Sequence, residues 1–522
     1  MFLKKVKGQL IIRQFSQAIA FSNKNQETFK FLKDYKLKCG LEIHTQLDTS
    51  KKLFSLSPTS FNERQNTRVS YFDVSLPGTQ PRLNPEALLY TLKAAVVLNS
   101  KINPISTFDR KHYFYGDQPL GYQITQHYNP ISKGGYITLT KEFDEINEVQ
   151  KIINIEQIQI EQDTGKSMYK NQDGNSQIDL NRSNMPLIEL VTKPDFEDLK
   201  QVKAFIKKFQ LLFKILKICT GDLETGAIRV DVNLSVNNGE RIEIKNLSST
   251  SAILNAIKYE YNRQVELIKQ GNPIISKETR GWDGFQTVKL RNKETAVDYR
   301  YMPDPELPPI VLDLADLIPN ISSNIPELPE EQLLKLSSKP HNCKLRDSRI
   351  LVQNQPLLNY YLTLFELLKE QNIKNLDKLS VNWCCHELLG ALTKLDLEFD
   401  HNLLPATKLA ELIIQVSHKA ITNNNAKLLL LHLLNNKEDL NKSIPELIEE
   451  YELGMDKLSE QEIVEFIDEV LKDPKNSKIV ETIQRGEKPK SINYLIGQCM
   501  RLSSGKVDSK VFEHHLTKRF KT

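Results

Sequence analysis

Cysteine pairs with the spacing of metal or redox motifs are missing from this sequence, although it contains 6 cysteines. None stands in a C-x-x-C pair, so a disulfide scaffold and a thiolate zinc site are both disfavoured, and a reducing compartment suits the chain. No run of about 18 apolar residues occurs, and we therefore expect no membrane span. With 39% hydrophobic and 26% charged residues, the composition is that of a globular protein.

Common nucleotide-binding and nucleophile motifs are missing as well. The sequence contains neither G-x-x-x-x-G-K-[ST] nor G-x-G-x-x-G. Gly165-Lys166-Ser167 resembles the end of a phosphate loop, but the upstream glycine is absent. Since G-x-S-x-G is also absent, an amidase acting on its own is disfavoured. Patterns of this kind therefore give no sign of nucleotide chemistry.

The positive charge of the chain is concentrated at its N-terminus. Residues 1–36 hold eight basic and two acidic residues, a surplus of six that exceeds the +4 of the whole chain and leaves the remainder at −2. The first 26 residues contain five basic residues and no acid. This composition predicts a transit peptide over 1–36, with a disordered basic tail as the alternative. Any RNA contact must then come from local basic patches.

The length of 522 residues suggests about three domains. Up to about residue 320, strand-like and helix-like segments mix. Alternating polar and apolar residues over 157–163 predict a strand with one covered face. A helix is expected after Pro194, capped by Asp195 and stopped at Gly221, and a second one over about 248–271. The apolar stripe of the first helix consists of Leu199, Val202, Ile206, Phe209, Phe213 and Leu216.

Beyond about residue 320 the strand signals fade, and leucine-rich helical patterns continue to the end. The proline-rich segment 303–309 permits neither a regular helix nor a central strand. Ser459 and Glu462 form a capping box at the start of one helix. The asparagine-rich stretch 422–425 predicts a loop or a domain joint. The pattern thus indicates a mixed α/β body followed by two helical modules.

Acidic residues in strand-like settings are the candidates for chemistry. Glu42 and His44 are two apart and point the same way on a strand, as do Gln159, Glu161 and Asp163. Glu189 lies in an otherwise apolar run, where an unpaired carboxylate costs several kcal/mol. Carboxylates with one imidazole and no thiolate suit a hard cation such as Mg²⁺. The alternative is a set of solvated glutamates and an ordinary hydrogen-bonded histidine.

A series of longer motifs follows in order along residues 37–520. They are Gly40-Leu41-Glu42-Ile43-His44, Leu76-Pro77-Gly78-Thr79 with Leu83-Asn84, Phe108-Asp109-Arg110-Lys111 with Tyr113-Phe114-Tyr115, Gly121-Tyr122-Gln123-Ile124, Glu161-x-Asp163-x-Gly165-Lys166-Ser167, Arg229-x-Asp231-x-Asn233, Glu243-Ile244-Lys245-Asn246-Leu247, Glu278-Thr279-Arg280, Asp298-Tyr299-Arg300-Tyr301 through Pro309, and Leu495-Ile496-Gly497-Gln498-x-Met500. Together they resemble the B subunit of glutamyl-tRNA(Gln) and aspartyl-tRNA(Asn) amidotransferases.

The resemblance implies an enzyme subunit that converts Glu-tRNA(Gln) to Gln-tRNA(Gln) in the mitochondrion (matrix). It implies binding of tRNA(Gln) charged with glutamate and phosphorylation of that glutamate by ATP with Mg²⁺. An amidase-type A subunit would supply ammonia as the glutaminase, and a small third subunit would complete the complex. Phosphorylation is needed because a carboxylate is a poor electrophile and oxide is a very poor leaving group.

Site residues can be carried over by position. The resemblance places the metal on Glu42, His44, Glu161 and Glu189, and these residues together with Lys245 form the expected catalytic set. It places Arg110 and Lys111 at phosphate or along the ammonia path, and Lys245 could do the same. For these three basic residues, surface salt bridges are the alternative.

The sequence departs from the family pattern in two places. Many bacterial relatives carry cysteines where this chain has Ser55, Ser57, Ser70 and Asp73, so we expect no structural zinc. Thr225 replaces the second acid of E-E-G-S, and Gln162 replaces another acid. These changes leave a second metal site in question. They also motivate an alternative function, a catalytically silent tRNA-binding scaffold of the same complex.

The fold class implied is α+β. We expect a mixed α/β cradle over 37–320, a helical domain over 321–402 and a helical YqeY-like tail over 403–522. Basic residues near the end of the tail are the candidates for holding tRNA, with a solvated helical face as the alternative. They are Arg485, Lys488, Lys490, Arg501, Lys506 and Lys510.

Overall fold

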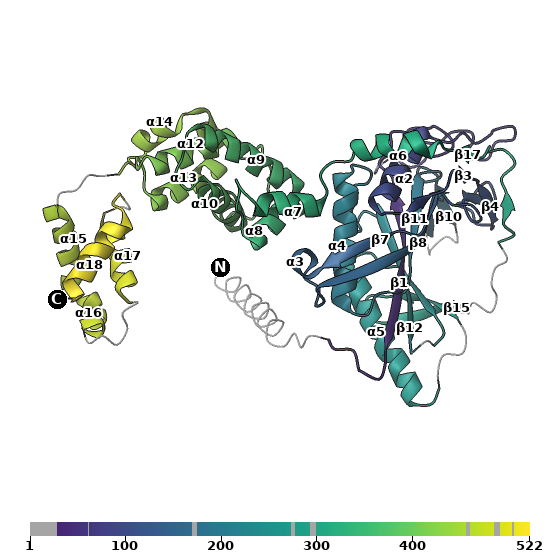
Figure 1. Ribbon diagram of the computed structural model, residues 1–522, viewed down its shortest axis with the longest axis horizontal. Coiled ribbons are helices and arrows are strands. Elements are labelled where there is room, and N and C mark those ends of the chain that lie inside the picture. The colour runs from purple at the N-terminus through teal and green to yellow at the C-terminus, as the bar shows by residue number, and fades with distance from the viewer. Residues whose placement is uncertain are drawn as a thin grey trace, which may run out of the picture. The chain divides into compact units, whose positions relative to one another are not determined.

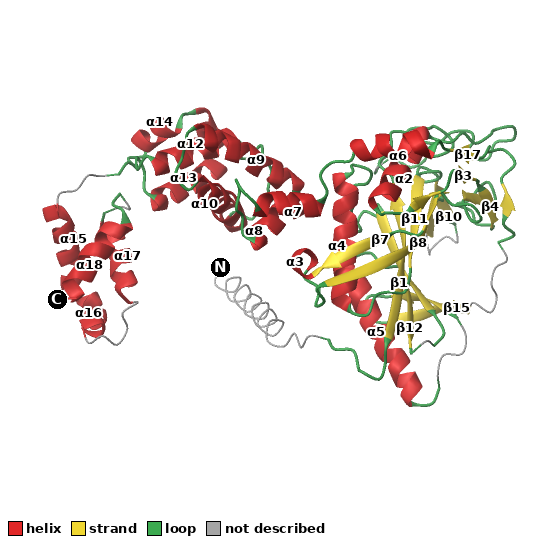
Figure 2. Cartoon of the chain, in the orientation of Figure 1, coloured by secondary structure: helices red, strands yellow, loops and turns green. Residues whose placement is uncertain are grey.

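The computed structural model describes residues 29–60, 62–169, 175–237, 239–272, 277–292, 299–455, 460–484, 491–503 and 506–521. The chain divides into two compact units, Met1–Leu328 and Pro329–Thr522. The named strands belong to the first unit, and the described part of the second is built from helices (Figure 2). The predicted α+β class is confirmed. Among the described residues, no helix has both the length and the apolar character to cross a membrane.

A sheet of ten strands forms the centre of the first unit (Figure 1). Its order is β15-β14-β13-β12-β1-β11-β8-β6-β2, with β7 paired to β8. Only β13 and β14 pair in parallel among these described strands. The bounds are β1 Leu37–Gln46, β2 Lys101–Ile102, β6 Ser132–Lys133, β7 Tyr136–Thr140, β8 Gln150–Gln162, β11 Pro186–Thr192, β12 Ile228–Val236, β13 Ile242–Lys245, β14 Glu278–Trp282 and β15 Thr287–Asn292.

Smaller sheets lie beside the large one. They are β10-β9 (Ser176–Asp179 and Lys166–Tyr169), β16-β4-β5 (Met302–Pro303, Asp109–His112 and Tyr122–Thr125) and β17-β3 (Ile310–Val311 and Ile105–Ser106). The predicted strand at 157–163 is confirmed as the end of β8. The proline-rich segment contributes only the short β16, because proline lacks the N–H that a ladder needs.

The two faces of the large sheet differ in chemistry. Side chains alternate along β1 and β12, and residues paired across antiparallel strands point to the same face. Leu41, Ile43, Val230 and Leu190 are buried on one face. The opposite face is polar, and it carries Glu42 opposite Asp231 and His44 opposite both Glu189 and Arg229. The candidate residues therefore share one face.

Helices α4 (Leu199–Ile215) and α5 (Thr250–Lys269) lie along the sheet and contribute to the hydrophobic core (Figure 1). Both predicted helices and the apolar stripe of the first are confirmed. The first begins later than predicted, because Asp198 is its cap and accepts from the Gln201 N–H at 2.7 Å. Asp195 instead accepts from Asn154. The other helices of this unit are α2 Pro85–Val97, α3 Lys141–Asp144 and α6 Leu314–Ser323.

The predicted stop of α4 at Gly221 is wrong. The helix ends at Ile215, and Lys217 already has a left-handed backbone with φ of 54°. That conformation ends a helix before any glycine is reached.

The second unit begins with helices that pack on one another up to about residue 455. They are α7 Pro329–Ser337, α8 Leu345–Gln353, α9 Gln355–Glu370, α10 Leu376–Val381, η1 Asn382–Leu388, α11 Leu389–Lys394, α12 Ala406–Ser417, α13 Asn423–Asn435, η2 Lys437–Asn441 and α14 Ile444–Glu450. The predicted loop at 422–425 is wrong, since α13 begins there. Thr422 accepts from the Asn425 N–H, and the Asn425 amide is buried and donates to Leu453 O.

The last helices have a hydrophobic core of their own. They are α15 Glu460–Lys472, η3 Pro474–Asn476, α16 Ser477–Gln484, α17 Ile492–Leu502 and α18 Ser509–Lys521. The predicted capping serine, Ser459, lies outside the described residues.

The divisions in the structure differ from the expected boundaries. The first unit continues past residue 320 because Ile321, Ile325 and Leu328 still pack in or on its core. No break in packing accompanies residue 402, since α12 packs against α9. The separate core begins only with α15.

Candidate active site

A cluster of three carboxylates surrounds one imidazole on the polar face of the sheet. The Nε2 atom of His44 lies 3.6 Å from Glu189 Oε2, 3.9 Å from Glu42 Oε1 and 3.9 Å from Glu161 Oε1. Glu42 and His44 come from β1, Glu189 from β11 and Glu161 from β8. The structure therefore brings together the four residues that were predicted to bind a metal.

Neutral side chains hold two of these carboxylates in place. Gln123 Nε2 donates to Glu161 Oε1 at 2.5 Å, and Thr125 Oγ1 donates to Glu161 Oε2 at 3.1 Å. Gln159 Nε2 donates to Glu189 Oε2 at 2.6 Å. None of these partners was among the predicted site residues, although Gln159 shares the face of Glu161 and Gln123 belongs to the Gly121–Ile124 motif. Amides and a hydroxyl thus position Glu161 and Glu189 alongside the His44 imidazole between them.

Burial, neighbouring carboxylates and the His44 imidazole together set the electrostatics of the cluster. Burial and the neighbouring Glu189 raise the pKa of Glu42 to about 7. Burial and Glu189 also raise the pKa of Glu161. Burial opposes charge on His44, but Glu189, Glu161 and Glu42 outweigh it and raise the pKa of His44 to about 9. The cluster therefore favours an additional positive charge.

Arg110 and Lys111 are neighbours on β4, but their side chains contact different groups. Arg110 binds Asp304 at 2.7 Å and Glu306 at 3.1 Å and stacks over Tyr122. The Lys111 ammonium lies 5.0 Å from the ring centre of Tyr299. Although burial opposes its charge, Glu161 and Glu189 contribute to raising the pKa of Lys111. Only Lys111 thus belongs to the electrostatic surroundings of the cluster, whereas Arg110 makes the salt bridges of the alternative interpretation.

Lys245 lies in a second acidic group on the same face. Its Nζ atom is 2.7 Å from Asp231 Oδ2 and 3.3 Å from Glu243 Oε1. Burial opposes its charge, but these two acids outweigh it and raise the pKa of Lys245. Glu42, Asp231 and Glu243 could also hold a metal, so Glu42 borders both groups. Asp231 and Glu243 belong to the motifs described above but were not among the predicted site residues.

The residues of the main cluster fit a hard divalent cation. Glu42, His44 and Glu189 each offer a ligand atom, and these atoms lie within 4.8 Å of one another. The donors are oxygens and one imidazole nitrogen, which suits Mg²⁺. Partial burial and Glu189 raise the pKa of Glu42, and a bound cation would oppose both effects.

Comparison with known proteins adds independent information. Residues 37–317 match the family described as the GatB/GatE catalytic domain, and residues 363–520 match the family described as the GatB domain. The chain belongs to the GatB family. The resemblance inferred from the motifs is therefore confirmed, and the chain is a subunit of an amidotransferase with partner subunits.

Several curated relatives are similar to this GatB chain over nearly their whole length. The B subunit of the mitochondrial glutamyl-tRNA(Gln) amidotransferase of Komagataella phaffii is 55% identical over 93% of this chain and 98% of its own. The proteins of the same name from Debaryomyces hansenii and Kluyveromyces lactis are 54% and 49% identical, covering 93% of this chain and 94% and 95% of their own. These relatives support the mitochondrial localisation of this GatB chain.

A buried ion pair occupies the place where family members were expected to carry zinc. Lys52 Nζ lies 3.1 Å from Asp73 Oδ2. The Ser70 N–H and the Asn184 amide also donate to Asp73, at 2.8 and 3.1 Å. With the Asp73 carboxylate so engaged and no thiolate at Ser55, Ser57 or Ser70, these residues do not fit a thiolate zinc site.

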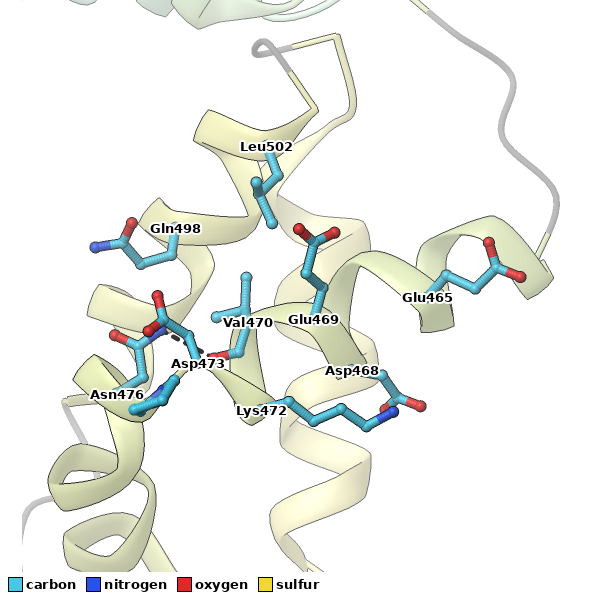
Figure 3. Close-up of a pocket in the computed structure, with 10 residues that line it drawn as sticks. Glu465, Asp468, Glu469, Val470, Lys472, Asp473, Asn476, Gln498 and Leu502 are labelled. Carbon is cyan, nitrogen blue, oxygen red and sulfur yellow. Dashed lines mark hydrogen bonds between the residues drawn. The ribbon is translucent and has the colours of Figure 1, made fainter.

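A cleft lined mainly by acidic side chains lies in the tail of this GatB chain. The cleft has a volume of about 630 Å³, and the residues that line it include Glu465, Asp468, Glu469, Lys472, Asp473, Gln498 and Leu502. Figure 3 shows these side chains. Among the predicted tRNA-binding residues, Arg501 and Lys510 are exposed and Lys506 is half-buried. Arg485, Lys488 and Lys490 lie outside the described residues. A tRNA phosphate backbone is therefore disfavoured at the acidic cleft.

Proposed function

We propose that this subunit activates the glutamate carried by tRNA(Gln) as a γ-glutamyl phosphate with ATP. Ammonia released by an amidase-type A subunit then displaces the phosphate, so that Glu-tRNA(Gln) becomes Gln-tRNA(Gln). A small third subunit completes the complex. The observation that carries the proposal is the cluster of Glu42, Glu161 and Glu189 around His44 on one face of the sheet.

In this proposal, the acidic residues and His44 hold the metal, and the lysines attract anionic groups. Mg²⁺, when bound, neutralises the ATP phosphates and the charge that develops during phosphoryl transfer. Glu42, His44, Glu161 and Glu189 are the residues that would hold it. Lys111, which borders the cluster, is placed to attract the transferred phosphate or the carboxylate of the substrate. Lys245, held between Asp231 and Glu243, is a second cation on the polar face.

Glu161→Gln tests the proposal because it keeps the size of the side chain and removes its charge. We expect tRNA-dependent ATP hydrolysis and transamidation to fall by about 100-fold or more, as several kcal/mol of charge stabilisation are lost. Glutaminase activity of the A subunit should largely survive. Glu156→Gln is the matched control, since Glu156 lies on the same strand but its side chain is 60% exposed.

The competing function is a tRNA-binding scaffold without catalysis, suggested by Thr225 in place of an acid. A scaffold predicts that the reconstituted complex containing Glu161→Gln transamidates at the normal rate. That outcome would overturn the proposed phosphotransfer. Supplying or withholding ATP in the same assay distinguishes loss of activation from loss of ammonia supply.

A further inference from the structure

A row of aromatic rings is exposed to solvent at both ends and passes the carboxylate cluster in its middle. The ring row consists, in spatial order, of Tyr115, Tyr113, Tyr299, Tyr301, His127 and Tyr128. Successive ring centres lie 5.6, 6.3, 6.1, 3.9 and 4.8 Å apart. Two segments far apart in sequence build the row, one around β4 and β5 and the other just before β16. Such spacing places the rings in continuous contact.

The outer part of the row is unusually exposed for aromatic side chains. Tyr115 is 61% exposed, and Phe114, between the first two members of the row in sequence, is 84% exposed. Phe114 nevertheless rests on Gly121, where an added Cβ would lie 3.2 Å from the Phe114 ring. The Tyr113 N–H donates to Gly121 O, which ties this loop to the start of β5. The loop thus presents rings to solvent from a defined backbone.

The middle of the row is linked to the cluster by hydrogen bonds. The Tyr113 hydroxyl donates to Gln123 Oε1 at 3.3 Å, and Gln123 Nε2 donates to Glu161 at 2.5 Å. The Lys111 ammonium lies over the Tyr299 ring. Burial and the charge of Glu161 raise the pKa of Tyr113, so its hydroxyl stays protonated as a donor. A group lying on the row would therefore enter the surroundings of Glu161.

Two arginines lie near the base of the ring loop, the segment 113–121 that connects β4 to β5 and carries Tyr113, Phe114 and Tyr115. Arg229 and Arg182 share the buried carboxylate of Asp163, at 3.0 and 3.8 Å. Arg182 also donates to Thr164 O and Gly165 O, and the Gly165 N–H donates to Asp117 O within the ring loop. The two guanidinium groups thus bring positive charge to the base of this loop, where the carboxylates of Asp163 and Asp117 face them. Both arginine side chains are more than a third exposed.

We propose that the ring row, together with Phe114, is a stacking platform for the unpaired nucleotides at the 3′ end of the aminoacylated RNA. The inference rests on the proposed function, since the terminal ribose carries the glutamate that must reach Glu161 and its neighbours. Single-stranded RNA is recognised by stacking of its bases on aromatic rings beside cations that meet its phosphates. One adenine of ATP would cover a single ring, whereas the row offers successive rings to successive bases.

The residues are positioning residues, and fluorescence can report their contact with the RNA. The probe is Glu-tRNA(Gln) with 2-aminopurine as its terminal base, bound to the full reconstituted complex. Stacking on the row should quench the fluorescence with the wild-type subunit. Phe114→Ala and Tyr115→Ala should diminish the quenching and raise the KM for Glu-tRNA(Gln) by roughly 5- to 100-fold each. Phe114→Trp should retain both properties.

Phe285→Ala is the matched control, because Phe285 is 89% exposed in the turn between β14 and β15 of the same unit. It should leave quenching and KM unchanged. Equal quenching by wild type and Phe114→Ala would overturn the proposal. A raised KM for ATP with an unchanged KM for the RNA would also overturn it, by assigning the rings to adenine. Failure of Phe114→Ala to assemble with the partner subunits would instead make the rings a protein interface.

The proposed function can fail independently of this inference. Quenching reports stacking in the absence of ATP, whereas phosphotransfer is measured by ATP-dependent transamidation. If the wild-type complex quenches the fluorescence and also transamidates without ATP, the proposed function is wrong. The stacking platform would still be supported by that result.

Discussion

Replacing Lys52 with methionine should strongly destabilise the first unit. The side chains of Lys52 and Asp73 are both 0% exposed, and their charged atoms are 3.1 Å apart. Lys52 also donates to Leu180 O at 3.2 Å. Burial lowers the pKa of Lys52 even though Asp73 opposes that shift. Methionine keeps most of the aliphatic stem and removes the charge, so the substitution tests the ion pair rather than the packing.

The magnitude follows from what remains around Asp73. Without Lys52, the buried carboxylate keeps only neutral donors among the described residues, the Ser70 N–H and the Asn184 amide. Breaking a buried ion pair in this way costs about 3–5 kcal/mol. That is a large share of the roughly 5–15 kcal/mol by which a typical domain is stable. Adding Asp73→Asn removes the stranded charge and should restore most of the loss, so the two substitutions should couple by about 3 kcal/mol.

Urea unfolding, followed by tryptophan fluorescence, measures the free energy of unfolding of each variant. The chain has 2 tryptophans, Trp282 in the first unit and Trp383 in the second, so the transition of the second unit is an internal control. Lys151→Met is the control substitution, because its partner Glu197 is 68% exposed and such pairs contribute less than about 1 kcal/mol. A Lys52→Met protein as stable as wild type, or a double variant whose losses simply add, would refute the reasoning.

Two further predictions concern zinc and RNA. Elemental analysis of the purified protein should find no stoichiometric zinc, because Lys52 and neutral donors already satisfy Asp73; one tightly held zinc per chain would contradict this. Deleting the residues beyond 455 removes the last helical core and its basic residues, so the KM for aminoacyl-tRNA should rise strongly and the salt dependence of tRNA binding should flatten, while glutaminase activity remains. Identical affinity and salt slope for truncated and full-length complexes would show that the tail does not hold tRNA.

The carboxylate cluster was predictable because strands repeat every two residues. Glu42 and His44 had to share a face of β1, and an acid in the apolar run around Glu189 needed a polar partner. The pairing that sets His44 opposite Glu189, and β8 next to β11, could not be predicted, since strand order depends on how the chain packs. Local chemistry was also ambiguous at helix starts: Asp195 and Asp198 are both good caps, and only the position of β8, where Asn154 engages Asp195, decides between them.

The family, the mixed body followed by helices, and the residue types of the site could all be predicted from the order of residues. These features depend on ordered motifs and on local periodicity, which survive without knowledge of the fold. The contacts between residues far apart in sequence could be seen only in the folded structure. It placed Lys111 near the cluster and Arg110 against Asp304, joined Asp231 and Glu243 to Lys245, and brought Tyr299 beside Tyr113. The physical reason is that these contacts join segments far apart in sequence, whose approach is set by the packing of the whole unit.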